Sequence, residues 1–374
     1  MQDTDPAPTT SQAACPADWI RLELTPGVGR DTVHLLLRCF DDPHAIFSAG
    51  YDNLVELISP AKARALSAPP DPRMAATIAR ALLWLSTPSN HLVTWHDPAY
   101  PPLLRQIPDP PVMLYAIGRV ELLSARSLAM VGSRNASAQG MANAQAFAHA
   151  LSAAGLAIVS GLAAGIDAAA HEGGLRAAGS TLAVVGTGAD RIYPSRNEAL
   201  ARRIAEQGCI VSEYALGTGP LPGNFPRRNR LISGLACGVL VVEAAAASGS
   251  LITASTAVSQ GRDVFAIPGS IHAPLSKGCH KLIKAGAKLV ESAADLLDEL
   301  RVAPLAGFAP HASAEYDGEH LPLLLALGHG PLNAETLAAL TDIEPGFLAG
   351  QLLALELAGH VERLPGGLFQ RLNQ

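Results

Sequence analysis

Hydrophobic residues change their spacing along this chain, and the changes divide it into three structured parts. The first part repeats apolar residues at the three- and four-residue intervals of amphipathic helices. The second part alternates short β-branched runs with Ala-rich segments of helical spacing. The third part has three short helical patterns followed by two strand patterns. The predicted organisation is a disordered tail 1–16, a helical domain 17–96, an α/β domain 97–300, a linker 301–317 and a C-terminal domain 318–374.

The strand patterns of the second part are apolar on both sides, without alternation between inside and outside. Strands of this kind are buried on both faces, which is typical of a parallel sheet with helices on both sides. We therefore predict an α/β protein with an extended Rossmann-like, doubly wound and mostly parallel sheet. The runs that carry this prediction are SLAMVG, LAIVSG, TLAVVG, CIVSE, GVLVVEA, DVFAIPG and AKLVES.

The first part contains Gly27-Val28-Gly29 between two helical segments. This arrangement is similar to a helix-hairpin-helix unit, whose turn can present backbone N–H groups to a phosphate. An ordinary tight turn in a small helical domain explains the same residues and is the favoured interpretation.

The third part has the pattern of a winged helix, with two strands around Pro365-Gly366-Gly367. A winged helix that binds DNA carries basic side chains on the second helix of its pair. Here that helix, EPGFLAGQLLALELAG, has no Lys or Arg, and residues 318–374 contain two basic and six acidic residues. Because a surface of this sign repels phosphates, contact with a protein is the favoured role, and control of duplex DNA is the weaker alternative.

The formal net charge of −6, taken over the whole chain, argues against a nucleic-acid partner. Between Arg126 and Val290, however, fifteen Lys and Arg residues face eight Asp and Glu residues, so that this segment carries +7. The rest of the chain carries 12 basic and 25 acidic residues, a balance of −13. The α/β domain is therefore basic and its flanks are acidic, which restores nucleic acid as a candidate ligand.

Composition excludes several other classes of protein. Apolar residues form 49% of the 374 residues, which indicates a folded chain with more than one core. The five cysteines lack metal-ligand spacing and are expected to be buried free thiols. The N-terminus lacks the features of a signal peptide, and no apolar run approaches the roughly 20 residues of a membrane helix. We expect a cytoplasmic protein that contacts no membrane and holds no metal.

Ligands of open parallel sheets bind at the carboxyl ends of the strands, so the loops that follow the strands are the expected place for a binding site. Three of them are rich in Gly and Ser and lead to helices, a combination that can bind anions through backbone N–H groups. Tight strand-to-helix turns are the alternative explanation. The loops are Gly132-Ser133-Arg134, Ser160–Gly165 and Gly186-Thr187-Gly188. Neither the dinucleotide fingerprint nor a Walker motif is present, which disfavours a nicotinamide-dependent dehydrogenase.

The densest candidate site is the heptapeptide Asn224-Phe225-Pro226-Arg227-Arg228-Asn229-Arg230. Guanidinium groups match phosphate oxygens, and Phe225 is suited to stack on an unpaired base. Arg227 and Arg230 share a helix face, whereas Arg228 points elsewhere. A solvated basic turn with Phe225 in the core is the alternative.

Four further residues, one Asp, one His and two Glu, are of types that can act as catalysts. Asp167 and His171 are spaced at i and i+4 and share a helix face, but no nucleophile or third ligand accompanies them. We favour a structural pair that anchors the Ser160–Gly165 loop. Glu213 and Glu243 each end a strand and lack an evident acid–base partner.

Together these residues resemble the DprA/Smf family of DNA-processing proteins. The resemblance runs through residues 97–300 and is carried by VGSR, VSGLAAGIDAAAH, YPSRN, FPRRNR, SGSLITA and GRDVFAIPGS. It implies a SAM-like helical domain at the N-terminus and a winged helix at the C-terminus. It further implies a non-enzymatic protein without a cofactor, which binds and protects incoming single-stranded DNA, forms a homodimer through the Rossmann-like domain and loads RecA recombinase during transformation.

The resemblance also places individual residues. Arg134 matches an arginine that holds the DNA backbone, and Phe225 matches an aromatic residue that contacts bases. Arg196 and, less closely, Lys277 border the same pocket. The residues expected to hold DNA phosphates are Gly132, Ser133, Arg134, Ser160, Gly161, Gly186, Gly188, Arg196, Arg227, Arg228, Asn229, Arg230 and Lys277.

An enzyme of another class remains as the alternative. Rossmann-like nucleotide hydrolases of the phosphoribohydrolase type also combine phosphate loops with a glutamate at a strand end, here Glu243. They typically carry a P-G-G-x-G-T-x-x-E loop, whereas this chain has Pro268-Gly269 followed by Ser270-Ile271.

Overall fold

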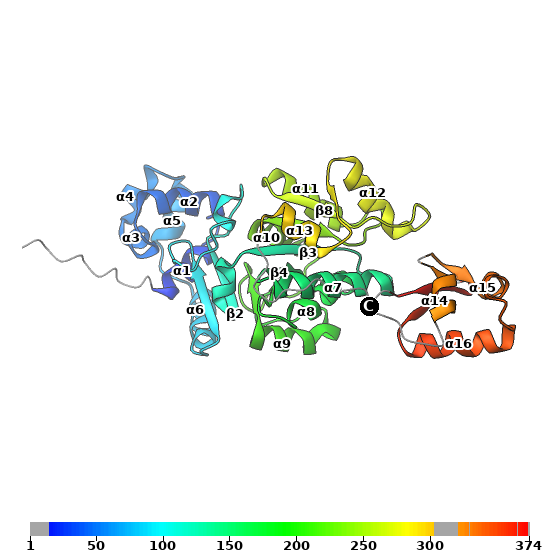
Figure 1. The fold of residues 1–374 in the computed structure, drawn as a ribbon. Coiled ribbons are helices and arrows are strands. Elements are labelled where there is room, and N and C mark those ends of the chain that lie inside the picture. The colour runs from blue at the N-terminus through cyan, green and yellow to red at the C-terminus, as the bar shows by residue number, and fades with distance from the viewer. Residues whose placement is uncertain (1–14, 303–320, 329, 365, 373–374) are drawn as a thin grey trace, which may run out of the picture.

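The structure is a computed structural model that describes residues 15–302, 321–328, 330–364 and 366–372. The predicted linker and nearly all of the predicted N-terminal tail lie outside these residues, although Pro16 already begins a helix. Figure 1 shows a helical domain at the N-terminal end, a central layered domain and a small C-terminal domain in a row.

Short helices form the first domain, around a core that includes Trp19, Leu36 and Leu54. Four of these helices begin with proline, whose missing N–H is harmless in a first turn that has no partner for it. Asp42 and Asp71 also cap two of the helices by accepting hydrogen bonds from backbone N–H groups. The helices are α1 (Pro16–Leu24), α2 (Arg30–Cys39), α3 (Pro43–Ser48), α4 (Gly50–Val55), α5 (Pro60–Ser67) and α6 (Pro72–Leu85).

A nine-stranded sheet forms the centre of the molecule, in the order β1-β2-β6-β5-β4-β3-β7-β8-β9. The strands from β3 to β9 are parallel, and β1 and β2 add an antiparallel edge. The predicted doubly wound, mostly parallel sheet is confirmed. The strands are β1 (Asn90–Thr94), β2 (Met113–Gly118), β3 (Ser127–Val131), β4 (Ala157–Ser160), β5 (Thr181–Val184), β6 (Cys209–Ser212), β7 (Gly238–Val241), β8 (Asp263–Ala266) and β9 (Lys288–Leu289).

Strand β1 was missed in the sequence, where residues 17–96 were expected to be helical. Its pattern of partly buried residues, with only Val93 fully buried, lacks the continuous apolar run of the inner strands. The inner strands β3 to β7 are buried at every residue, as expected for strands covered on both faces.

Helices pack on both faces of this sheet (Figure 1). One face carries α10, α11 and α12, and the opposite face carries α7, α8, α9 and α13. Ser137 is the N-cap of α7, where its side chain accepts a hydrogen bond from the Gly140 N–H. The helices are α7 (Ala138–Ala153), α8 (Ile166–Gly174), α9 (Glu198–Gln207), α10 (Asn224–Leu235), α11 (Ser250–Ser259), α12 (Lys277–Lys284) and α13 (Ala293–Glu299), with 3-10 turns η1 (Leu104–Gln106), η2 (Val120–Ser124), η3 (Ser195–Asn197) and η4 (Pro274–Ser276).

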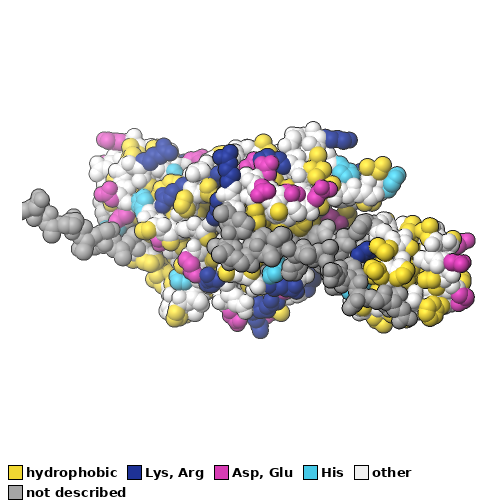
Figure 2. Space-filling model, viewed as in Figure 1, with side chains coloured by type: hydrophobic (Ala, Val, Ile, Leu, Met, Phe, Trp, Pro, Cys, Tyr) yellow, Lys and Arg dark blue, Asp and Glu magenta, His cyan; other side chains and the backbone are white. Residues whose placement is uncertain are grey.

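Three helices and a small sheet of order β10-β12-β11 form the C-terminal domain, which is a winged helix as predicted. The strand β10, which precedes the second helix, was not foreseen. Figure 2 shows acidic side chains gathered at the outer end of this domain, whereas Lys and Arg gather over the central domain. Its elements are α14 (Leu321–Leu327), β10 (Leu332–Asn333), α15 (Ala334–Thr341), α16 (Pro345–Leu357), β11 (Val361–Leu364) and β12 (Leu368–Arg371).

The cysteines follow the expectation only in part. Cys209 and Cys279 are buried free thiols and Cys237 is partly buried, but Cys15 and Cys39 are exposed. Cys15 precedes the first turn of α1, and Cys39 is the last residue of α2. Within the described part of the chain, no helix is both long and apolar enough to cross a membrane.

Candidate nucleic-acid interface

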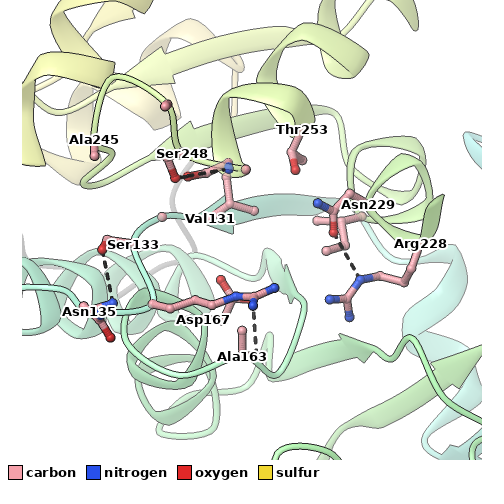
Figure 3. Close-up of a pocket in the computed structure, with 16 residues that line it drawn as sticks. Val131, Ser133, Asn135, Ala163, Asp167, Arg228, Asn229, Ala245, Ser248 and Thr253 are labelled. Carbon is pink, nitrogen blue, oxygen red and sulfur yellow. Dashed lines mark hydrogen bonds between the residues drawn. The ribbon is translucent and has the colours of Figure 1, made fainter. Parts of the chain in front are cut away.

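The direction of winding reverses between β3 and β7, and a hollow of about 520 Å³ lies at that reversal. This is the position at which open α/β sheets bind ligands. The loops that follow the two strands line one side of the hollow, with Ser133 and Asn135 on one loop and Ala245 and Ser248 on the other. Arg228 and Asn229 line the opposite side (Figure 3). The lining comprises Val131, Gly132, Ser133, Arg134, Asn135, Ala163, Asp167, Arg228, Asn229, Ile232, Ala245, Ala247, Ser248, Gly249, Ser250 and Thr253.

A smaller hollow of about 90 Å³ adjoins the first, because Arg134, Ala163 and Arg228 line both. We call the two together the strand-end groove. The smaller hollow adds aromatic side chains to the polar walls of the larger one. Its lining comprises Arg134, Gly161, Ala163, Ala164, Tyr193, Pro194, Arg196, Phe225 and Arg228.

Arg134 is an exposed cation in the middle of this groove. The loop that carries it is fixed, since the Ser133 N–H donates to the Glu243 carbonyl at 2.8 Å and the Ser133 carbonyl accepts from the Ile166 N–H at 3.2 Å. The Arg134 guanidinium lies 6.0 Å from the centroid of the Phe225 ring. Among the described residues no acid pairs with Arg134, so its charge is available to an anion.

Phe225 and Tyr193 form an aromatic pair in the groove, with ring centroids 5.5 Å apart. Gly186 supports the ring, since a Cβ atom built on Gly186 would lie only 3.0 Å from Phe225 Cδ1. Tyr193 is 47% exposed. Sequence reasoning overlooked Tyr193 and considered only Arg196 from the same YPSRN segment, although an aromatic residue in a loop after a strand was a signal worth following.

The structure corrects the expectation that Arg228 contacts phosphate through an open side chain. Arg228 is only 4% exposed, and its guanidinium donates to the backbone carbonyls of Gly161, at 2.8 Å, and Val184. Burial lowers the pKa of Arg228 to about 10, against the opposing effect of Asp167. Arg228 therefore ties together the ends of β4 and β5 and acts as a positioning residue at the floor of the groove.

Arg230 also differs from its expected role. Its guanidinium pairs with the buried carboxylate of Glu213 and lies 3.3 Å from Asp109 Oδ2. Arg30, from the helical domain, joins the same cluster at 3.1 Å from Glu213 and 2.6 Å from Asp109. These four residues, which we call the interdomain ion-pair cluster, connect the helical domain to α10. Arg230 is thereby placed outside the lining of the strand-end groove.

The Ser160–Gly165 loop was expected to offer free N–H groups to phosphate, and this expectation is wrong for Gly161, Leu162 and Ala163. Asp167 accepts hydrogen bonds from Gly161 N at 3.1 Å and Ala163 N at 3.3 Å, and His171 Nε2 accepts from Leu162 N at 3.2 Å. The Ser160 hydroxyl donates to the Met130 carbonyl. The side chains of Asp167 and His171 therefore already occupy these backbone N–H groups, which confirms the two residues as the structural pair that anchors the loop.

The ionisation of this pair agrees with its structural role. Burial lowers the pKa of His171 to about 3, so the imidazole is neutral at physiological pH. Because Nε2 accepts a hydrogen bond, the proton sits on Nδ1, which lies 2.7 Å from the Thr181 hydroxyl. Burial raises the pKa of Asp167, and the neighbouring Arg228 opposes that rise.

The remaining predicted residues are divided between the groove and other places. Gly132, Ser133, Gly161, Arg196 and Asn229 line the groove. Arg227 is exposed and lines a separate hollow beside the helical domain.

Two of the predicted residues lie elsewhere. The Gly188 N–H donates to the Thr218 carbonyl and is not available to an anion. Lys277 donates to the Ile271 carbonyl at the start of α12, and it lines neither part of the groove.

The hollow lined by Arg227 contains about 250 Å³ and separates the helical domain from the sheet. Glu23, on α1, has its Oε2 atom shielded from solvent there, with no hydrogen-bond partner among the described residues. Burial, and next the charge of Glu213, raise the pKa of Glu23 to about 8, while Arg30 opposes the rise. The folded protein therefore keeps this carboxyl protonated at a pH where the unfolded chain has lost the proton.

We expect Glu23→Gln to remove a pH dependence of stability. With a pKa raised from 4.5 to about 8, Glu23 makes the free energy of unfolding fall as pH rises through that window. The fall is on the order of a few kcal/mol, at about 1.4 kcal/mol per pH unit. Urea unfolding of both proteins at pH 5 and pH 9 measures this difference. Parallel pH profiles would contradict it, whereas the variant is expected to gain relative stability at pH 9.

Glu243 occupies a structural position. Its Oε1 accepts from the Ser137 hydroxyl at 2.6 Å and its Oε2 accepts from the Ser137 N–H at 3.0 Å. A Cβ atom at Gly140 would collide with this carboxylate, so the side chain is packed into the first turn of α7. No group of three His, Cys, Asp or Glu residues suited to a metal ion occurs within the described ranges.

These observations define a class of protein: a Rossmann-like α/β protein with a strand-end groove, a helical domain and a winged helix. The groove combines an arginine that has no acidic partner among the described residues with the exposed Tyr193 ring and the partly buried Phe225 ring. The family model of DNA recombination-mediator protein A matches residues 91–301, and that of the DprA winged helix domain matches residues 308–367. The chain belongs to the DprA/Smf family of DNA-processing proteins.

Sequence comparison with individual proteins supports this family assignment. The chain is 42% identical over 299 residues to the protein Smf of Escherichia coli, covering 78% of this chain and 80% of that protein. It is 50% identical over 203 residues to the DNA processing protein DprA of Streptococcus pneumoniae, covering 54% of this chain and 72% of that protein.

Solved structures support the same fold. The X-ray structure of DprA from Streptococcus pneumoniae matches with a TM-score of 0.62 at 38% identity, over 77% of this chain and 99% of that chain. A structure of DNA processing protein A from Helicobacter pylori, described for its single-stranded DNA binding mode, matches with a TM-score of 0.52 at 29% identity, over 56% of this chain and 96% of that chain.

Proposed function

We propose that this protein binds single-stranded DNA in the strand-end groove without regard to sequence. One observation carries the proposal. Arg134, which has no acidic partner among the described residues, lies in one hollow with the Phe225 and Tyr193 rings. An arginine holds the phosphate backbone, and aromatic rings stack on bases of any kind. The single-stranded DNA binding mode described for the Helicobacter pylori relative supports the same ligand.

Single strands fit this groove better than duplex DNA. In a duplex the faces of the bases are covered by their neighbours, so a ring such as Phe225 stacks on a base only after the strands separate. Tyr193 comes from the loop that precedes η3, and Phe225 comes from the first turn of α10, so the two rings meet from separate elements at the groove.

Phe225→Ala is expected to weaken binding of single-stranded DNA by about 5- to 100-fold, because a stacked aromatic side chain contributes about 1–3 kcal/mol per base. The dependence of affinity on salt should stay the same, since no charge is lost. Fluorescence anisotropy with a labelled oligonucleotide at several salt concentrations measures both quantities. Phe225→Trp serves as the matched control and should retain affinity; equal affinities of the alanine variant and the wild type would remove Phe225 from the interface.

The cellular role that we propose is protection of incoming DNA and loading of RecA recombinase during transformation, in the cytoplasm. A homodimer through the Rossmann-like domain would place two grooves along one strand and raise avidity without new contacts. RecA filament growth on single strands, measured with and without this protein, tests the loading step, and analytical ultracentrifugation tests the dimer. Growth that is unchanged by the protein would contradict a mediator role.

The acidic winged helix is proposed to contact a protein rather than DNA. Its described surface carries acidic side chains at the outer end, and α16, the second helix of the pair formed by α15 and α16, has no basic residue. Removal of residues 318–374 should therefore leave the affinity for single strands unchanged. Loss of that affinity would favour the alternative of a DNA-binding winged helix.

The alternative function, hydrolysis of nucleotides, has less support from the geometry. Glu243, its candidate catalyst, is held by Ser137 in the first turn of α7 and does not line the groove. Incubation with nucleoside monophosphates is the test, and release of a free base would revive an enzymatic function.

A further inference from the structure

A second basic hollow, of about 430 Å³, lies between the helical domain and the loop that leads from β6 to α10. We call it the α6 hollow. One wall is the α6 helix, and the other is the turn after Ala215. Its lining comprises Arg73, Ala76, Thr77, Arg80, Leu216, Gly217 and Thr218.

The charge in the α6 hollow comes from two exposed arginines, Arg73 and Arg80. They are seven residues apart on α6, which places them on one face two turns apart. Arg80 reaches the Thr77 hydroxyl at 3.4 Å, and neither arginine has an ion pair with an acid in the described part of the chain. The nearby Asp71 accepts the Met74 N–H as the cap of α6. Two cations without counter-charge thus face the same open hollow.

Hydrogen bonds connect the α6 hollow to the strand-end groove. The Gly188 N–H donates to the Thr218 carbonyl at 3.0 Å, and the Gly217 N–H donates to Asp190 Oδ1 at 2.8 Å. The loop that begins at Gly186 therefore touches the α6 hollow at one end, and it presents Tyr193 to the groove at the other.

The same two loops are packed against the helical domain. Ala189 and Leu216 are buried in the core of that domain, together with residues of α1 and α2. These buried contacts therefore hold the two loops in a fixed position relative to α6.

We propose that the α6 hollow is a second contact for the same strand of DNA, at which Arg73 and Arg80 hold phosphates of the segment that leaves the groove past Tyr193. This rests on the proposed function of the groove. Exposed arginines without an acidic partner match phosphate oxygens, and no aromatic residue lines the open hollow to stack on a base. The contact should therefore depend on the length of the strand and not on its sequence.

The test is the double variant Arg73→Ala/Arg80→Ala, with affinities measured over single strands lengthened in steps from about 4 nucleotides. The shortest strands occupy the groove alone and should bind the variant as they bind the wild type. Strands long enough to reach α6 should bind the variant several-fold to about tenfold more weakly. The salt dependence for long strands should also fall by about 0.7 per lost phosphate contact.

The matched control is Arg38→Ala/Arg64→Ala, which removes the same charge from exposed positions on α2 and α5 of the same domain. The control should bind long strands like the wild type, and both double variants should keep the thermal unfolding temperature. Equal affinities of the α6 variant and the wild type at every length would overturn the second contact and leave the groove in place. A failure of short strands to bind the wild type would instead contradict the proposed function itself.

Discussion

Arg134→Ala is expected to weaken the binding of single-stranded DNA by about 10- to 100-fold at low salt. Hydrogen bonds to charged groups contribute about 1.5–3 kcal/mol, and 1.4 kcal/mol corresponds to a factor of ten. Arg134 has no acidic partner among the described residues, so its removal takes a full positive charge from the groove and leaves no unpaired acid behind. The salt dependence of binding should decrease by about 0.7 for the lost phosphate contact.

The control for this prediction is Arg203→Ala. Arg203 is exposed on α9, where it pairs with Glu172 at 2.8 Å and does not line the groove. Its removal changes the net charge of the protein by the same amount and should leave affinity nearly unchanged. If the two variants lost affinity equally, the effect of Arg134 would reflect overall charge rather than a contact in the groove.

The largest loss of stability is expected from Glu213→Ala, at about 3–5 kcal/mol of the free energy of unfolding. The Glu213 side chain is only 3% exposed and pairs with both Arg30 and Arg230. After its removal, the largely buried guanidinium groups of Arg30 and Arg230 keep only Asp109 as an acidic partner. The Asp109 side chain is half exposed to solvent. Chemical denaturation of the variant measures the loss.

A double-mutant cycle with Arg230→Ala separates this pair from other effects. The double variant Glu213→Ala/Arg230→Ala should be less destabilised than the sum of the two single variants, because the second change removes a buried charge that the first left unpaired. Arg230→Ala alone should lower stability and affect DNA binding only through the position of α10. Additive losses would show that the pair is not coupled, and a loss of affinity at full stability would return Arg230 to the DNA contacts.

The architecture was largely predictable from the sequence. Apolar runs such as LAIVSG and GVLVVEA identify strands that are covered on both faces, and they correctly indicate the parallel sheet. The edge strand β1 was not predicted, because an edge strand buries few residues and its hydrophobic pattern continues that of the preceding helix α6. Periodicity reports burial, and elements with little burial carry little signal.

The site was predictable in location but not in the role of each arginine. The helical spacing in FPRRNR shows that Arg228 points away from Arg227 and Arg230, but it does not show which direction is buried. The structure sends Arg228 into the floor of the groove and Arg230 into an ion-pair cluster with Arg30, which is 200 positions earlier in the sequence. Long-range partners of this kind leave no local pattern.

Backbone groups were predicted least well. Ser160 and the glycines after β4 have the composition of an anion-binding loop, yet the Asp167 side chain accepts hydrogen bonds from the Gly161 and Ala163 N–H groups. Composition shows that a loop has small residues, but the availability of its N–H groups depends on side chains that fold back onto it. In this groove the exposed Arg134 and the aromatic pair therefore carry more of the proposed binding than the loops do.

The central claim is that the strand-end groove binds single-stranded DNA through phosphate charge and base stacking. The most direct test is a salt titration of the affinity for single and double strands of matched length. The account predicts tighter binding to the single strand at every salt concentration, and a linear fall of log affinity with log salt concentration. Equal or tighter binding to the double strand, or an affinity for single strands that does not change with salt, would contradict it.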